Sequence, residues 1–464
     1  MLHLYPKKRT NIMLARKLDS FLDSFYESGH SKALLLTGAR QVGKTWAVRN
    51  LAKRKFTHYV EINFVETPEA KDIFSGAQDA RQILLRLSAF VRDPLVAGKT
   101  LILFDEVQEC PEVVTQIKFL VDEGSYRYAL SGSLLGVELK DLRSEPVGYM
   151  DVVDVFPFDL EEFCKVIGVA DNVINELREA YENRRQVDEV VHKQMMSVVS
   201  LYLIVGGMPA AVNAYVQTQN MQKVTAEQRA IINLYKRDIS RYDPEEKLYL
   251  DDIFELIPSE LNARNKRFIL KNLNENFKLS RYQNSFLWMW KAGVAIPTFN
   301  VTEPVSPLLL NKQRNLFKLF QNDVGLLAYQ YSNGIQMEIL KGNVNVNYGA
   351  VYENFVAQEL ISKGHPTYYF NNKKLGELDF VTDNGSGAVV PIEVKSGKEY
   401  YVHSALDNVM GVPNYNIKQA IVLCNENLTE EGRVLNMPIY MIMFFKKSES
   451  SIGQFMIDIS ALLA

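Results

Sequence analysis

The chain has 464 residues, of which 47% are hydrophobic and 23% charged, and its formal net charge is -3. This length and composition are typical of a globular soluble protein of about two to four domains. The near-neutral charge restricts any nucleic-acid binding to local basic patches. Three scattered cysteines without a CxxC pair argue against a disulfide scaffold or a zinc site, and they indicate a reducing cytoplasm.

The predicted elements follow one another in a recognisable order. Residues 11–30 have the pattern of an amphipathic helix, and Ala33–Thr37 that of a short strand. Helix and strand patterns alternate to about residue 155, which predicts an α/β unit. Residues 160–240 are predicted helical. Within them, Gln194 to Gln222 carries no charge, but its serines and the "GGMP" turn favour two buried helices over a membrane span.

The second half of the chain has two further parts. Residues 245–330 are predicted to form a small mixed domain. From about residue 345 a helix at 349–363 precedes strands at 367–370, 377–382, 388–395 and 419–423. This order predicts a second α/β unit.

A phosphate-binding loop is predicted at "GARQVGKT", which lies between a strand and a helix pattern. Glycines let the backbone N–H groups face phosphate oxygens, and the N-terminus of a helix also favours anions. Lys44 would reach the β- and γ-phosphates of ATP, and Thr45 would ligate magnesium. The expected nucleotide-binding residues of the loop are Gly38, Ala39, Arg40, Gln41, Val42, Gly43, Lys44 and Thr45.

The stretch "LILFDEVQ" at 101–108 supplies the second half of a nucleotide site. Apolar residues ending in two acids form a Walker B pattern, about 60 residues after the loop. Asp105 is expected to hold Mg²⁺ through water, and Glu106 to orient or deprotonate the attacking water. The predicted cofactors are therefore ATP and Mg²⁺, with Lys44 and Glu106 as catalytic residues.

A basic run, "LNARNKRFILKNLNENFKLSR", covers residues 261–281. The helix and strand patterns after it suggest a winged-helix module that contacts DNA phosphates without reading sequence. A solvated face or a subunit contact is the alternative. Trp288 and Trp290 are expected in the core or an interface. The DNA-binding candidates are Arg264, Lys266, Arg267 and Lys271.

An acid–acid–lysine pattern lies in "GELDFVTDNGSGAVVPIEVKSGK", from Gly376 to Lys398. If the "DNGSG" turn pairs Thr382 with Ala388, then Asp379, Glu393 and Lys395 share one face of a hairpin. Two carboxylates near one point suit Mg²⁺ or Mn²⁺, and a lysine beside the metal can position water and stabilise charge on phosphate. Glu353, on the preceding helix, would add a third acid.

These four residues resemble the PD-(D/E)xK nuclease motif, with Glu353, Asp379 and Glu393 as metal ligands and Lys395 as the catalytic lysine. A degenerate nuclease domain that binds DNA or protein without cutting is the alternative reading. His365 and His403 are possible proton shuttles, although loop histidines usually have no such role.

The chain as a whole resembles bacterial and archaeal AAA+ ATPases that carry a C-terminal DUF4143-type domain related to restriction-endonuclease folds. The resemblance rests on "LLLTGARQVGKT", "LILFDEVQECP", "LSGSLLG", "VFPFDLEEF", "YLIVGGMPAAV", "LFKLFQNDVGLL" and "PIEVKSG". It implies an α/β fold with a P-loop ATPase core at 1–157, a helical lid at 158–244, a winged-helix-like domain at 245–340 and a nuclease-like α/β domain at 341–464.

The same resemblance implies further residues of the nucleotide site. Asn63 would restrain Glu106, and either Ser131 or Ser133 would sense the γ-phosphate or the attacking water. Gly148-Tyr149 replaces the glycine-arginine found in many relatives, which leaves Arg143 as the candidate arginine finger.

Three functions compete at this point. The first is an ATPase that controls a DNA-associated nuclease-like domain. The second is a nucleotide-controlled signalling or assembly switch with an inactive nuclease fold, and the third is a partner-binding protein that keeps ATP as a stabilising ligand. ATP is the predicted ligand in all three, with DNA and a homo-oligomer as further predicted partners.

Overall fold

A computed structural model describes most of the chain. The described residues are 16–29, 31–132, 148–242, 247–263, 266–268, 285–286, 288–331, 336, 338–339, 349–385, 387–397, 401 and 403–447. The predictions for Ser133, Arg143, Arg264 and Lys271 therefore lie outside the described residues.

A five-stranded parallel sheet forms the N-terminal unit, with the order β2-β3-β4-β1-β5. Successive residues of a strand point to opposite faces. Leu34 and Leu36 accordingly join one hydrophobic cluster, and Ala33 and Leu35 join another. The strands are β1 (Ala33–Thr37), β2 (His58–Asn63), β3 (Thr100–Asp105), β4 (Arg127–Ser131) and β5 (Met150–Asp154). The helices of this unit are α1 (Lys17–Glu27), α2 (Lys44–Lys55), α3 (Ala80–Phe90) and α4 (Pro111–Glu123).

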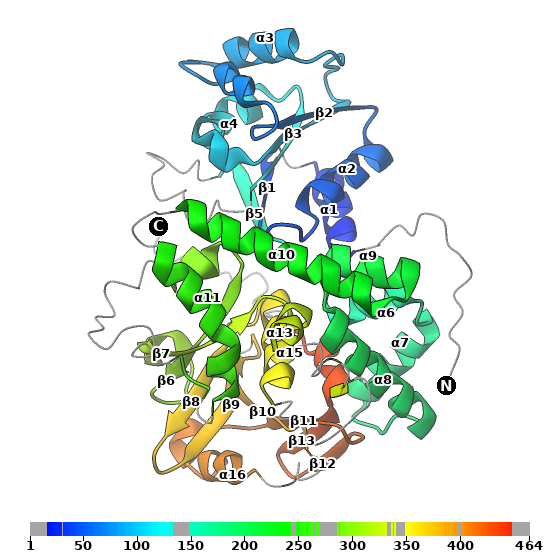
Figure 1. Ribbon diagram of the computed structural model, residues 1–464, viewed down its shortest axis with the longest axis vertical. Coiled ribbons are helices and arrows are strands. Elements are labelled where there is room, and N and C mark those ends of the chain that lie inside the picture. The colour runs from blue at the N-terminus through cyan, green and yellow to red at the C-terminus, as the bar shows by residue number, and fades with distance from the viewer. Residues whose placement is uncertain are drawn as a thin grey trace, which may run out of the picture.

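A helical layer lies between the two sheets, with α10 running across the molecule (Figure 1). It begins where Asp159 and Glu162 form a capping box, which satisfies backbone N–H groups at the start of α6. The uncharged stretch forms α8 and α9 around a Gly-Pro turn, as predicted. Along the described residues, the structure has no helix with the length and apolarity that crossing a membrane requires. The helices are α6 (Leu160–Ile167), α7 (Asp171–Glu182), α8 (Glu189–Val205), α9 (Pro209–Thr218), α10 (Met221–Tyr242) and α11 (Lys247–Asn262).

The second sheet has eight strands in the order β12-β13-β11-β10-β9-β8-β6-β7. Its strands are β6 (Ala295–Val301), β7 (Lys312–Gln321), β8 (Tyr368–Asn372), β9 (Gly376–Asp383), β10 (Val389–Val394), β11 (Ala420–Cys424), β12 (Thr429–Glu431) and β13 (Val434–Pro438). Its helices are α13 (Val324–Tyr331), α15 (Gly349–Ser362) and α16 (Ser404–Met410).

The middle segment differs from the winged-helix expectation in one respect. β6 pairs in parallel with β8, so the β6–β7 hairpin extends the C-terminal sheet. The second sheet therefore contains strands from both sides of residue 340. The described residues of 245–340 do not show a separate winged-helix module.

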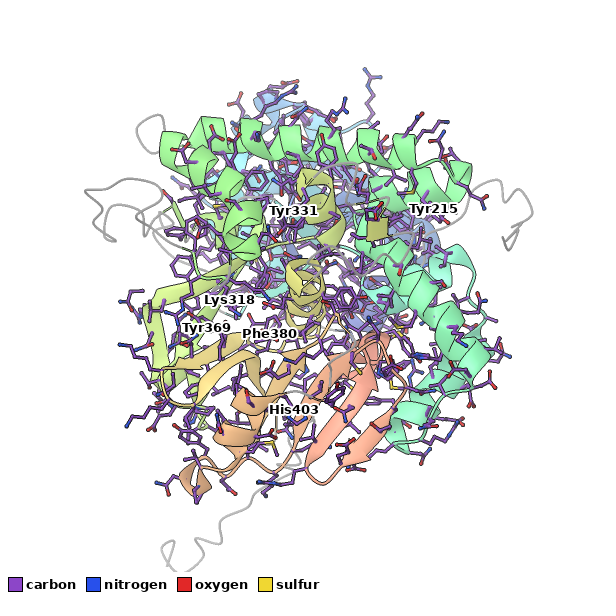
Figure 2. The ribbon with its side chains drawn as sticks, turned by 60° about the horizontal axis from the view of Figure 1, so that its bottom comes forward. Tyr215, Lys318, Tyr331, Tyr369, Phe380 and His403 are labelled. Carbon is purple, nitrogen blue, oxygen red and sulfur yellow. The ribbon has the colours of Figure 1, made fainter. Side chains whose placement is uncertain are left out.

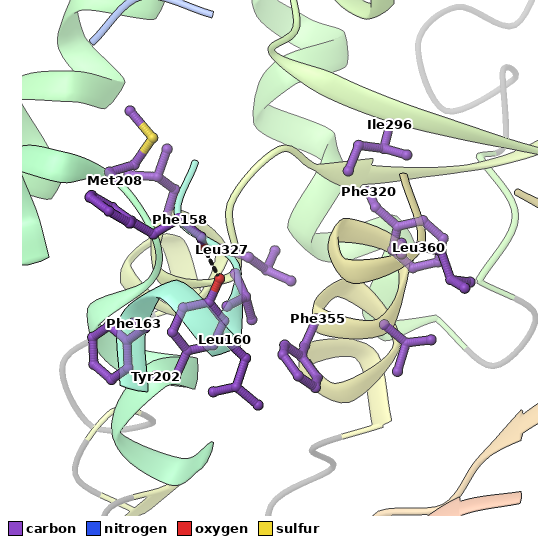
Figure 3. Close-up of a cluster of buried hydrophobic side chains, with 14 of the residues drawn as sticks. Phe158, Leu160, Phe163, Tyr202, Met208, Ile296, Phe320, Leu327, Phe355 and Leu360 are labelled. Atoms are coloured by element: carbon purple, nitrogen blue, oxygen red, sulfur yellow. Dashed lines mark hydrogen bonds between the residues drawn. The ribbon is translucent and has the colours of Figure 1, made fainter. Parts of the chain in front are cut away.

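One hydrophobic core connects the ATPase sheet, the helical layer and the C-terminal sheet. Leu36 of β1, Tyr202 of α8, Phe355 of α15 and Met437 of β13 all belong to the same cluster of buried residues. Figure 3 shows the middle of this cluster, where the Tyr202 hydroxyl donates a hydrogen bond to the carbonyl of Phe158. The C-terminal sheet is thus packed against the helical layer over a continuous apolar surface.

Candidate nucleotide site and carboxylate cluster

The phosphate-binding loop follows β1 and opens α2, as the sequence predicts. Gly38 has φ of 121° and Gly43 has φ of 96°, a region that side chains with a Cβ rarely adopt. A Cβ on Gly38 would lie 2.3 Å from the carbonyl oxygen of Val155. Both glycines are therefore required by the backbone path of the loop.

Lys44 is buried against this loop, with only 8% of its surface exposed. Its Nζ donates to the carbonyls of Gly38 and Ala39, at 2.8 Å each. Burial lowers the pKa of Lys44 to about 8, although Glu106 and Asp105 act in the opposite direction. The ammonium is held inside the curve of the loop, which is where the motif would place a phosphate group.

Asp105 lies at the end of β3 and accepts hydrogen bonds from three neighbouring elements. Thr45 Oγ1 lies 3.1 Å and Asn63 Nδ2 3.2 Å from its Oδ2, and the Ser131 hydroxyl donates to Oδ1. The parallel register places Asn63 and Ser131 directly beside Asp105. Burial raises the pKa of Asp105, and its hydrogen bonds act against this shift.

This arrangement adds a contact and a residue to the predicted site. Asn63 donates to Asp105, and its predicted restraint of Glu106 stays a prediction. Glu106 has φ of 55°, and one of its carboxylate oxygens accepts from Gln108 Nε2. Sequence reasoning missed Gln108, although "DEVQ" places it two residues beyond Glu106.

Other parts of the chain support the loop from outside. Arg16 Nη1 donates to the Val42 carbonyl at 2.6 Å, and Arg40 Nε lies 2.7 Å from Asp238 Oδ2 on α10. A Cβ on Gly293 would lie 2.8 Å from the Ala39 nitrogen. These contacts span up to 254 residues of sequence, from 39 to 293, so no local pattern indicated them.

A cavity of about 320 Å³ opens beside the loop. Arg16, Gly43 and Trp46 line it, together with Phe158 and Pro209. The Arg16 guanidinium lies 4.6 Å from the centre of the Phe158 ring. The cavity thus joins the phosphate loop to an aromatic surface near the start of the helical layer.

The C-terminal acids come together on a register that differs from the predicted one. Val381 pairs with Pro391 and Phe380 with Ile392, so the hairpin is shifted by two residues from the predicted pairing of Asp379 with Pro391. Because side chains alternate with period two, the shift keeps Asp379 and Glu393 on one face. Asp379 Oδ2 accepts from the backbone N–H of Val394 at 2.9 Å.

Lysines occupy this cluster together with the acids. Glu353, only 1% exposed, pairs with Lys266 and lies 3.5 Å from Lys318 Nζ. Lys395 Nζ lies 3.6 Å from Glu393 Oε2. The Lys266 ammonium thus pairs with a buried carboxylate, and its predicted DNA contact stays a prediction.

The predicted metal ligands Glu353, Asp379 and Glu393 each lie beside a lysine ammonium. Among the described residues, no group of three or more His, Cys, Asp or Glu side chains could hold a metal ion. Burial and the Asp379 charge raise the pKa of Glu393 well above its usual range, and burial also raises that of Glu353. The cluster as it stands is an acid–lysine network.

The remaining predicted residues are placed as follows. Trp288 is buried, as expected for a core residue, and Trp290 is 46% exposed. His365 stacks on Phe445 at 4.6 Å, and His403 Nδ1 lies 3.1 Å from Asp407. Each histidine is therefore held by a structural partner.

Family models match three segments of the chain. Residues 30–164 match an AAA domain, 196–336 match a domain of unknown function (DUF8612), and 348–441 match a domain of unknown function (DUF4143). A comparison with curated proteins gave no match. The predicted boundaries at 157, 244 and 340 stay predictions.

Solved structures with related architecture are distant. A Walker-type ATPase of Pyrococcus abyssi shares 14% identity and a TM-score of 0.41, covering 71% of this chain and 99% of its own. The RuvB Holliday junction branch migration motor of Thermotoga maritima shares 13% identity at a TM-score of 0.27, and the match covers 60% of this chain and 86% of that protein. Cdc6p of Pyrobaculum aerophilum shares 13% identity at a TM-score of 0.27, and the match covers 74% of this chain and 98% of that protein. Similarities this low leave the function to be argued from the residues of this chain.

The phosphate loop, the acids at the end of β3 and the family matches agree with one another. The chain contains an AAA-type P-loop ATPase domain over residues 30–164 and a DUF4143 domain over residues 348–441.

Proposed function

We propose that the protein hydrolyses ATP and that its nucleotide state controls the C-terminal domain, as in a signalling or assembly switch. The observation that carries the ATPase part is the position of Lys44, Thr45 and Asp105. The lysine lies in the loop, and the threonine hydroxyl lies 3.1 Å from the carboxylate. These are the groups that a Mg²⁺–nucleotide complex requires.

Each residue then has a definite task. Lys44 neutralises phosphate charge, while Thr45 and Asp105 would hold Mg²⁺, which draws charge from the phosphates. Glu106, oriented by Gln108, accepts a proton from the attacking water. The cavity beside Trp46 and Phe158 offers aromatic surface to the nucleobase.

Contacts around the loop support control of the C-terminal domain. Arg40 of the loop pairs with Asp238 of α10, and the Tyr235 hydroxyl of the same helix lies 3.5 Å from the Arg40 carbonyl. Asn322 Nδ2, at the end of β7, donates to that hydroxyl at 3.0 Å. A phosphate that displaces the loop therefore acts on a chain of contacts that ends in the second sheet.

A DNA-associated nuclease-type domain is the second candidate. Asp379, Glu393 and Lys395 lie together in the C-terminal sheet, as that function requires. Of the DNA-binding candidates, Arg267 is described and partly exposed. Charge reversal at Lys266 is unsuitable as a test, because it would place a second carboxylate against Glu353.

The ATPase is tested by phosphate release and ATP-binding calorimetry on matched pairs of variants. Lys44→Ala is expected to abolish binding or turnover, whereas Lys53→Ala, at an exposed lysine of the same helix, should behave as wild type. Glu106→Gln should bind ATP but hydrolyse it about 10²–10⁴-fold more slowly. Glu109→Gln is its control. Equal turnover in Lys44→Ala and Lys53→Ala would contradict the assignment.

A combined assay separates the two candidates for the C-terminal domain. ATP hydrolysis, oligomeric state and DNA cleavage are followed with and without duplex or branched DNA, in Mg²⁺ or Mn²⁺. Nucleotide-dependent assembly without cleavage supports the switch. Cleavage that disappears in Asp379→Ala supports the nuclease, and it leaves the ATPase assignment intact.

A further inference from the structure

Lys318 is a fully buried lysine at the centre of the C-terminal acids. It belongs to β7, its side chain is 0% exposed, and its Nζ lies 2.9 Å from Glu377 Oε1. The same nitrogen lies 3.5 Å from Glu353 Oε2 and 4.0 Å from Asp379 Oδ1. One ammonium thus faces carboxylates from β9 and from α15.

The aromatic surroundings add to this placement. Nζ lies 5.2 Å from the centre of the Tyr369 ring, within the range of a cation–π contact. Figure 2 labels Lys318 and Tyr369 close to each other, in agreement with this distance. The Lys318 ammonium therefore contacts both an aromatic ring and carboxylates.

The six carboxylate oxygens of Glu353, Glu377 and Asp379 are already engaged. The two oxygens of Glu353 face Lys266 and Lys318, and those of Glu377 face Lys318 and the Asn371 amide. Asp379 faces Lys318 with Oδ1 and the Val394 N–H with Oδ2. A divalent cation would need several of these oxygens at about 2.0–2.6 Å, in competition with the ammonium groups.

We infer that the ammonium of Lys318 takes the position that the sequence motif reserves for a divalent cation, so that the acids of the DUF4143 domain form a metal-free ion network with lysines of the preceding segment. The formal charges of the cluster agree with a network that holds no metal ion. Glu353, Glu377, Asp379 and Glu393 supply four acids, and Lys266, Lys318 and Lys395 supply three cations. Their formal charges sum to −1, whereas an added Mg²⁺ would change the sum to +1 beside a buried ammonium.

The network itself is independent of the proposed switch. Only the role that it gives the C-terminal domain in the protein rests on that proposed function. A network of this kind fixes β7, β9 and α15 to one another and opposes binding of the metal that metal-assisted cleavage would need. Lys266 also anchors the segment after α11 to Glu353. The domain is accordingly a recognition module, and ATP hydrolysis is the chemistry of the chain.

The first test counts bound Mn²⁺ by electron paramagnetic resonance in nucleotide-free, full-length protein. Wild type and Asp379→Asn are expected to bind the same amount, because the cluster takes none. Loss of one bound ion in Asp379→Asn relative to wild type would overturn the inference. ATPase activity is measured alongside, and its failure would count against the proposed function alone.

The second test removes the internal cation. Lys318→Met should lower the melting temperature by on the order of 5 °C or more. Mn²⁺ should restore part of that loss in Lys318→Met and have no effect on wild type. The double variant Lys318→Met/Glu353→Gln, which removes one charge of each sign, should recover stability without Mn²⁺. A Mn²⁺-dependent rise in the wild-type melting temperature that Asp379→Asn abolishes would overturn the inference, even if Lys318→Met does not fold.

Discussion

Lys44 combines two properties at a single residue: burial in the free protein and a required charge in the nucleotide complex. Its pKa is lowered to about 8 because the loop shields it from water. Phosphate charge favours the ammonium form, so bound ATP raises this pKa again. The two states of the protein therefore hold different numbers of protons over a defined pH window.

From this difference we predict that ATP binding takes up a proton between about pH 8 and the usual lysine value of 10.5. Affinity should fall with rising pH in that window, by up to about tenfold per pH unit. Calorimetry in buffers of different ionisation enthalpy measures the uptake. In Lys44→Arg, whose side chain stays charged, residual binding should show no uptake. An equal uptake in that variant would assign the proton to another group.

The sequence motifs predict which residue types form the nucleotide site. They predict less well which side chains hydrogen-bond to one another there. The loop motif fixed Lys44 and Thr45 because phosphate chemistry demands them at that spacing. Asn63 is predicted to restrain Glu106, and the structure shows that it donates to Asp105, since the parallel register aligns the two strand ends. Arg16, Tyr235 and Asp238 reach the loop through tertiary packing, which no local pattern encodes.

At the scale of elements, the turn between α8 and α9 is locked to the start of α13. Asp323 accepts from the Gly207 N–H at 2.5 Å and from the Leu326 N–H at 3.0 Å. Gly325 lies so close that a Cβ there would be 2.6 Å from the Gly206 nitrogen. The helical layer and the second sheet thus meet backbone to backbone at this point.

Gly325→Ala is therefore predicted to lower the free energy of unfolding by about 2 kcal/mol or more, because backbone atoms cannot move aside as a side chain can. Gly397→Ala, with open space around the added Cβ, should change it by less than about 0.5 kcal/mol. Urea denaturation of both variants measures the difference. Equal stability would mean that the turn can shift without cost.

The hairpin of β9 and β10 shows how far an element can be predicted. The turn residues "DNGSG" gave the correct hairpin and the correct face for Asp379 and Glu393, although the pairing was displaced by two residues. A shift by two residues leaves each side chain on the same face of the sheet, but it changes which residues pair. The sequence predicts β6 and β7 in another domain, because the pairing of β6 with β8 joins residues about 70 positions apart.

At the scale of the molecule, the continuous core predicts that both sheets unfold together. Leu36, Tyr202 and Phe355 belong to one cluster, so exposing either sheet exposes the helical layer as well. We expect a single cooperative transition in calorimetry, with fluorescence of Trp46 and Trp288 changing at the same temperature. An ATP analogue should raise the temperature of the whole transition. Two separate transitions would show that the core is divided.

The length of α10 has a mechanical consequence. The helix has 22 residues, and Asp238 near its C-terminal end holds Arg40 of the phosphate loop. Met221 lies 17 residues before Asp238 (238 − 221), about 25 Å away along the helix axis. A tilt of about 10° about the Arg40 contact would displace that far end by ~4 Å, somewhat less than one helical turn of about 5.4 Å. Because Val224 near that end is buried in the common core, we expect such a tilt to shift the core residues packed along α10 as well.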